Sequence, residues 1–199
     1  VLAQMQELFR GVKAGRKAHC LAELIKEIHE QPKVIKDTIN SVLADGNISF
    51  ESVGLSDEDM KNIQQVYIVA CGSAYHVGMV AQYVIEELTS LSVRVELASE
   101  FRYRQMKLAK NSLAIIISQS GETADSLAAL RLCKEKGVKT LGIVNVVGSS
   151  IAREADNVFY TLAGPEISVA TTKAYSCQLV AAYLLAMQFA KARGEISDE

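Results

Sequence analysis

The sequence has no long hydrophobic run and no marked excess of charge of either sign. The longest apolar stretch without a charge near the C-terminus, residues 174–190, still contains a serine and two glutamines. It falls short of the roughly 20 apolar residues that a transmembrane helix needs, so we interpret it as a buried helix. The 21 basic and 23 acidic side chains leave a formal net charge of −2. That balance does not favour binding to nucleic acid or to an anionic membrane surface.

The sequence also lacks the usual patterns of disulfide, metal and nucleotide sites. Its four cysteines form no CxxC pair and no secretory signal is present, which favours reduced thiols and a cytoplasmic location. The three histidines are isolated from one another, so we expect no metal site and no cofactor. The string GxxxxGK[ST] is absent, which excludes a P-loop.

Strand-like and helical patterns alternate along most of the chain. With 199 residues, 49% of them hydrophobic, the chain can bury one substantial core. Val- and Ile-rich runs predict strands at 66–70, 93–97, 113–117, 140–144 and 158–162, and apolar periodicity predicts helices at 74–88, 123–136 and 170–193. We therefore predict an α/β fold, a Rossmann-like three-layer sandwich in which helices flank both faces of a five-stranded parallel sheet.

The segment before the first strand reads as largely helical. Apolar spacing predicts a helix over about 16–43, broken at Gln31-Pro32 because proline has no backbone N–H to donate. Asp45-Gly46-Asn47 predicts a turn, and Ser56 followed by three acidic residues predicts the start of a further helix.

The most informative motif is the polar loop at residues 118–123, Ser-Gln-Ser-Gly-Glu-Thr, which joins a buried strand to a helix. Unpaired N–H groups and the helix dipole favour an anion at such a helix start. Ser118, Ser120 and Thr123 add hydroxyl donors, Gln119 adds an amide, and the loop has no Lys or Arg. The predicted ligand is a small phosphate group held by neutral donors. The same residue types are also good helix caps, which is the alternative interpretation.

Two other polar turns occupy equivalent positions. Cys71-Gly72-Ser73 follows the first strand, and residues 164–173 precede the last helix. Ligands of such sheets bind beyond the carboxyl ends of the strands, so we expect the three turns to share one ligand.

Several strings carry a family resemblance. ACGSAYHVGM (70–79), ELASEFRYR (96–104), SQSGETADSLAALR (118–131) and EISVATTKAY (166–175) are similar to the first sugar isomerase (SIS) domain of the glutamine–fructose-6-phosphate aminotransferase family, and KEIHEQP (26–32) resembles its entry segment. SQSGET alone indicates only the wider superfamily of sugar-phosphate-binding SIS domains. The second and fourth strings point to this family.

The resemblance implies roles for individual residues. It assigns the phosphate of the substrate to Ser118, Gln119, Ser120 and Thr123, and the sugar to Cys71, Gly72, Ser73, Val169 and Thr171. Two positions depart from the family pattern. Ala74 stands where a phosphate-binding Ser is usual, which implies weaker phosphate binding, and Ser168 replaces a usual Gly, which implies a tighter loop.

The resemblance also implies a division of the chain and a set of partners. We expect a linker or foreign segment at 1–24, a helical lead-in at 25–60 and the SIS domain at 61–199. The family's acid–base groups belong to a second SIS domain and a C-terminal tail, so no catalytic residue is expected here. The implied reaction converts fructose 6-phosphate and glutamine to glucosamine 6-phosphate and glutamate.

The expected partners are fructose 6-phosphate or glucosamine 6-phosphate, the second SIS domain, a glutaminase domain and a second copy of the chain. We expect that copy to pair through the apolar face of residues 174–190. The alternatives are a non-catalytic SIS effector module of a sugar-phosphate-responsive regulator and a stand-alone phosphosugar isomerase. A regulator would carry a helix-turn-helix upstream, where this chain has KEIHEQP instead.

Overall fold

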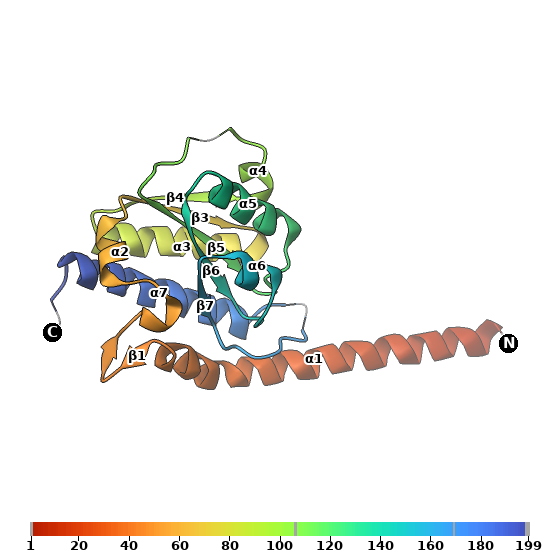
Figure 1. Ribbon diagram of the computed structural model, residues 1–199. Helices are drawn as coiled ribbons and strands as arrows, with labels where there is room; N and C mark the ends of the chain where they lie inside the picture. The colour runs from red at the N-terminus through yellow and green to blue at the C-terminus, as the bar shows by residue number, and fades with distance from the viewer. Residues whose placement is uncertain (1, 106, 169, 198–199) are drawn as a thin grey trace.

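A five-stranded parallel sheet forms the centre of the protein. The computed structural model describes residues 2–105, 107–168 and 170–197, with side chains from residue 20 onward. The strand order is β4-β3-β5-β6-β7, and all neighbouring strands run parallel (Figure 1). The strands are β3 (Gln65–Ala70), β4 (Ser92–Leu97), β5 (Ser112–Ser118), β6 (Lys139–Val144) and β7 (Asn157–Tyr160).

Helices cover both faces of this sheet, which confirms the predicted three-layer sandwich. Residues Ile115 and Ile117 of β5 pack in one core, while Ala114 and Ile116 pack in the other, as expected for a strand buried on both sides. The first core is closed by α2 (Asp57–Asn62), α3 (Gly72–Leu88) and α7 (Lys173–Arg193), and the second by α4 (Ala98–Phe101), α5 (Ala124–Glu135) and α6 (Ser150–Glu154).

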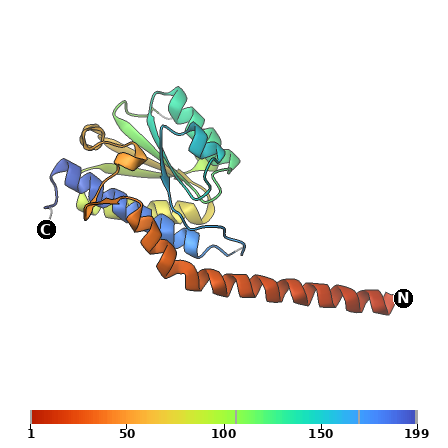
Figure 2. The ribbon, with the colours of Figure 1, turned by 60° about the horizontal axis from the view of Figure 1, so that its bottom comes forward.

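Helix α1 (Leu2–Asn40) runs without a break through Pro32, so the predicted interruption at Gln31-Pro32 is wrong. Proline cannot donate to the carbonyl of Ile28 four residues earlier. The side chain of Gln31 does so instead, with its Nε2 3.3 Å from that oxygen. Figure 2 shows α1 changing direction where it meets the body of the protein, while its N-terminal part projects away. The predicted boundary at residue 24 falls inside this helix, and the domain division stays a prediction.

Short elements link α1 to the sheet. Strands β1 (Leu43–Ala44) and β2 (Asn47–Ile48) form an antiparallel hairpin whose turn residues Asp45 and Gly46 both have positive φ, which confirms the predicted turn. A 3-10 helix, η1 (Glu51–Val53), follows. Ser56 is the N-cap of α2, which confirms the helix start predicted there, and it forms a capping box with Asp59. The sequence pattern did not predict β1, β2, η1, α4 or α6.

Helix α7 is buried within the chain, as expected. Its apolar residues pack against α1, α3 and the sheet, so the face over 174–190 is already covered and the self-association surface predicted there is wrong. Helix α1 exposes the apolar side chains of Leu21, Ile25 and Ile28, while Tyr183 is the large apolar side chain that α7 exposes among the described residues. Neither α7 nor any other helix in the described ranges is long and apolar enough to cross a bilayer.

The strand order determines where loops meet. Strand β4 lies on one side of β3 and β5 on the other, which creates a switch point at the carboxyl ends of β3 and β5. The loop after β5 is fixed there by Gly121, whose φ is +66°. A Cβ atom at this position would lie 2.1 Å from Ser149 Oγ, and the Gly121 carbonyl accepts from Ile151 N at 3.0 Å.

We expect Gly121→Ala to destabilise the protein more than Gly137→Ala. Both glycines have a positive φ near 70°, so each substitution carries a backbone cost of about 1–2 kcal/mol. Nothing lies within 4 Å of a Cβ at Gly137, whereas a Cβ at Gly121 overlaps Ser149. Urea unfolding of both variants measures the difference, which is the cost of the contact. Equal losses would show that the loop moves away without resistance.

Candidate functional site

A cleft of about 300 Å³ opens at this switch point. It is lined by Cys71, Gly72, Ser73, Ala74, Ile117, Ser118, Gln119, Ser120, Thr123, Thr171 and Gln178. The structure therefore brings together every predicted phosphate- and sugar-binding residue except Val169, which lies outside the described residues. Their binding roles stay predictions, while their common location is observed.

Two helices begin at the cleft with open N-termini. The residues that precede α3 and α5, Cys71 and Thr123, make no side-chain capping bond to their helices. The N–H groups of each first turn and the positive ends of both dipoles are thus available to an anion. The alternative in which the hydroxyls of the 118–123 loop serve as caps of α5 does not describe the observed bonds.

Those hydroxyls bond within their own loop instead. Ser118 Oγ accepts from Gly121 N at 3.1 Å, and Ser120 Oγ accepts from Glu122 N at 3.2 Å. Ser118 Oγ also lies 3.1 Å from Thr123 Oγ1. Because a hydroxyl that accepts from an amide keeps its own proton for donation, the loop orders its oxygens and leaves O–H protons for a ligand in the cleft.

Helix α7, in contrast, begins with its first N–H groups already occupied. Glu166 Oε1 accepts from Thr172 N at 2.9 Å and from Ala174 N at 3.3 Å, and its Oε2 accepts from Thr171 Oγ1 at 2.9 Å. This carboxylate neutralises the third helix start near the cleft and fixes the position of Thr171.

The chemistry of a helix start also explains Glu122, which is a structural residue here. Its carboxylate accepts from the backbone N and the Oγ of Ser150, both at 2.7 Å, and so ties the 118–123 loop to α6. These two bonds, with the charge of Arg153, lower the pKa of Glu122 below its usual value against the opposing effect of desolvation.

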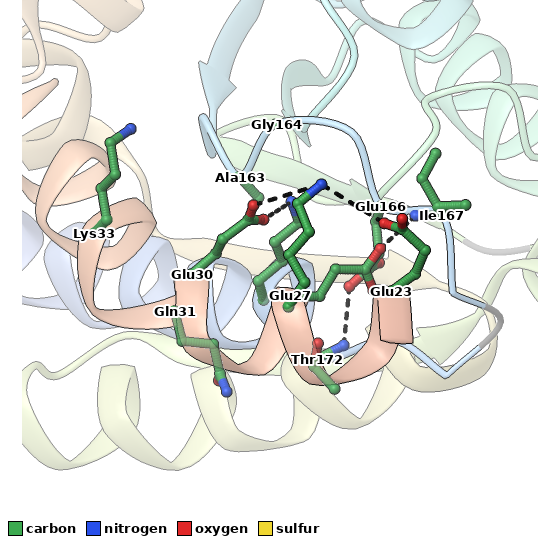
Figure 3. A network of polar contacts seen from close by, with 12 residues as sticks. Glu23, Glu27, Glu30, Gln31, Lys33, Ala163, Gly164, Glu166, Ile167 and Thr172 are labelled. Atoms are coloured by element: carbon green, nitrogen blue, oxygen red, sulfur yellow. Dashed lines mark hydrogen bonds and ion pairs between the residues drawn. The ribbon is translucent and has the colours of Figure 1, made fainter. Parts of the chain in front are cut away.

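Side chains of α1 bond to the 164–172 loop and hold it in place (Figure 3). Glu27, only 1% exposed, accepts from Ile167 N at 2.5 Å, from Ser168 N at 3.1 Å and from Ser168 Oγ at 2.5 Å. Ser168, the residue that departs from the family pattern, is therefore bonded directly to the helix. One carboxylate on α1 thus positions the loop that carries Thr171 to the cleft.

Lys173 pairs with α1 through a second carboxylate. Its ammonium lies 2.6 Å from Glu30 Oε2, and the residue is 3% exposed. It lines a separate cleft of about 420 Å³ between α1 and the 162–167 segment and is not among the residues that line the cleft at β3 and β5. A lysine amine can act as a nucleophile or form an ion pair, and the structure shows the ion pair for Lys173.

Sequence reasoning missed Glu27, Glu166 and Gln178. The two glutamates lie within strings that carried the family resemblance, but their bonds become visible only in three dimensions. Gln178 did leave a signal, because it is a polar residue at an inward position of an apolar helix. In the part of the chain that the structure describes, no cluster of three or more His, Cys, Asp or Glu side chains is placed to hold a metal ion.

Acid should weaken the attachment of the 164–172 loop. Burial raises the pKa of Glu27, but bonds from Ser168 and Ile167 and the charge of Lys173 bring it below the usual 4.5. A depressed folded-state pKa contributes stability above the unfolded value and loses it as the pH falls through the folded value. We expect Glu27→Gln to lower the free energy of unfolding by about 1–3 kcal/mol at neutral pH.

The difference in free energy of unfolding between Glu27→Gln and the parent chain should shrink toward acid pH. Urea unfolding across the acid range measures this change. Glu23→Gln is the matched control on the same helix, because Glu23 pairs with the exposed Lys26 at 3.6 Å. A difference for Glu27→Gln that stays constant with pH would contradict the assignment.

Comparisons with known proteins show the family of the chain. The SIS domain model matches residues 59–188. The glutamine–fructose-6-phosphate aminotransferase (isomerizing) of Clostridium tetani is 55% identical over 177 residues, which are 88% of this chain and 29% of that protein. The chain therefore spans less than a third of the length of that relative.

Solved structures show the same fold. The C-terminal domain of glucosamine-fructose-6-phosphate aminotransferase from Francisella tularensis matches with a TM-score of 0.83 and 44% identity, over 88% of this chain and 49% of that one. The sugar isomerase domain of the RpiR transcription factor from Sphaerobacter thermophilus matches with a TM-score of 0.63 and 18% identity, over 85% of this chain and 94% of that one. This match is a likeness of fold alone. From the family match over residues 59–188 and the parallel sheet with its loops, the chain belongs to the SIS domain family.

Proposed function

We propose that this chain is the phosphosugar-binding SIS domain of a glutamine–fructose-6-phosphate aminotransferase, and that its cleft binds fructose 6-phosphate or glucosamine 6-phosphate. The observation that carries the proposal is the convergence of two uncapped helix N-termini and a hydroxyl-rich loop on one cleft. The identity of 55% with the Clostridium tetani enzyme supports the choice of this family.

The geometry suits a phosphate ester that is bound and then released. The described lining residues include no Lys or Arg, so the charge of the phosphate is balanced by N–H and O–H dipoles. Ala74 lines the cleft without a polar side-chain atom, which removes a donor from the start of α3. We therefore expect phosphate affinity below that of a relative with Ser at this position, because a hydrogen bond to a charged group contributes about 1.5–3 kcal/mol.

In the proposed enzyme, this domain holds the substrate while other parts supply the chemistry. Ammonia released from glutamine adds to the carbonyl at carbon 2 of fructose 6-phosphate, the carbonyl oxygen leaves as water, and a base then moves a proton from carbon 1 to carbon 2. The 118–123 loop anchors the phosphate so that the sugar chain extends toward Ser73 and Thr171. The acid–base groups belong to a second SIS domain and the ammonia to a glutaminase domain, both of which we propose as partners.

We further propose a homodimer in the cytoplasm. The exposed apolar side chains Leu21, Ile25 and Ile28 of α1 are the residues best suited to contact a partner, because they follow one another at helical spacing. The alternative of a regulatory SIS module is supported only by fold, since the RpiR domain shares 18% identity.

Removal of a loop hydroxyl should weaken phosphate binding. We expect Ser120→Ala or Thr123→Ala to lower the affinity for fructose 6-phosphate by about 1.5–3 kcal/mol each, because a charge-assisted bond is lost. Titration calorimetry measures the change. Ser126→Ala is the matched control, since Ser126 lies in the first turn of α5 but outside the cleft, with a buried hydroxyl that has no partner. Full affinity in both loop variants would place the phosphate elsewhere.

The chain alone should bind fructose 6-phosphate without isomerising it. The described lining residues contain no His, Asp, Glu or Lys that could transfer a proton. An aldose–ketose assay on the 199-residue chain measures turnover against a buffer blank. Isomerisation well above that blank would instead support a stand-alone phosphosugar isomerase.

A further inference from the structure

Gln178 is a buried polar residue to which the proposed function gives no role. It lies on α7, is 3% exposed and lines the cleft at β3 and β5. No side-chain hydrogen bond joins Gln178 to any other residue in the described ranges. Its side chain faces the cleft.

A largely buried glutamine whose amide makes no hydrogen bond requires a physical explanation. A buried polar group without a partner costs free energy, so such groups are rare in folded proteins. The other buried glutamine of α7, Gln188, is also 3% exposed, but its Nε2 donates to Asp57 at 2.7 Å. The two glutamines share a helix and a degree of burial, and they differ in what their amides face.

The chemistry of the amide indicates which part of a ligand it contacts. The loop at 118–123 presents O–H donors, which suit a phosphate that can only accept. A glutamine amide both donates and accepts, which matches a sugar hydroxyl, since that group does the same. Gln178 enters the cleft from α7 together with Thr171, the residue that Glu166 fixes in place.

We propose that Gln178 determines specificity for the sugar: its amide exchanges hydrogen bonds with a hydroxyl of the bound phosphosugar. The inference rests on the proposed function, because it takes the 118–123 loop as the phosphate site. Gln178 then distinguishes a sugar phosphate from inorganic phosphate, to which it contributes nothing.

The test compares two ligands on one isosteric variant of the 199-residue chain. Gln178→Met keeps the length and the apolar contacts of the side chain and removes the amide. We expect the Kd for fructose 6-phosphate to rise about tenfold or more, with the Kd for inorganic phosphate unchanged. The midpoint of urea unfolding should stay about the same, because the amide that is removed faces the cleft and bonds to no described residue.

Gln188→Met is the matched control. It breaks the bond to Asp57, so we expect a lower unfolding midpoint with both affinities unchanged. Gln178→Asn, which keeps an amide on a shorter side chain, should recover part of the affinity for fructose 6-phosphate. This second variant also tests the proposal if the methionine variant fails to fold.

The outcomes separate the two levels of inference. A parent chain that binds neither ligand overturns the proposed function and this inference with it. A parent chain that binds both, with a methionine variant that binds fructose 6-phosphate equally well, overturns the role of Gln178 alone. An equal loss of affinity for both ligands also overturns it, because the residue then acts on the phosphate or on the fold.

Discussion

The alignment of β3 and β5 in one parallel register is the constraint on which the candidate site depends. Ala70 and Ile117 are paired neighbours at the carboxyl ends of these strands. The chain must then turn into α3 and α5 side by side, and each helix start carries N–H groups that its own backbone cannot satisfy. Without side-chain caps, both sets of donors point to the same space. The fold thus produces an anion site before any specialised side chain is added.

Acidic and hydroxyl side chains have different roles around the cleft. Glu27, Glu122 and Glu166 each accept backbone N–H groups from the segments that surround the cleft, and none of them lines it. Their negative charges hold the loops rigid while they remain outside the space proposed for the phosphate. The hydroxyls that line the cleft are neutral, so they donate to an anion without repelling it.

The sequence predicted those features that depend on local patterns. The Val- and Ile-rich runs revealed all five strands of the sheet, and the 118–123 loop was recognisable from residue types and the strand before it. Features set by distant contacts were not predictable. The continuity of α1 depends on a side-chain bond from Gln31 to Ile28, and the role of Glu27 depends on a loop 140 residues later in the chain. Gln178 stood out as a polar residue in an apolar helix, but the sequence does not tell what its amide faces.

A cleft without cations obtains its selectivity from the part of the ligand that is not phosphate. Dipoles at helix starts attract any small anion, so by themselves they do not distinguish one phosphate ester from another. In the proposed complex, discrimination depends on the groups placed toward the sugar. Of these, Thr171 is held by Glu166 and its loop by Glu27 on α1. The same helix exposes Ile25 and Ile28 to solvent. A partner that covers those side chains would contact the helix that positions the loop proposed to face the sugar.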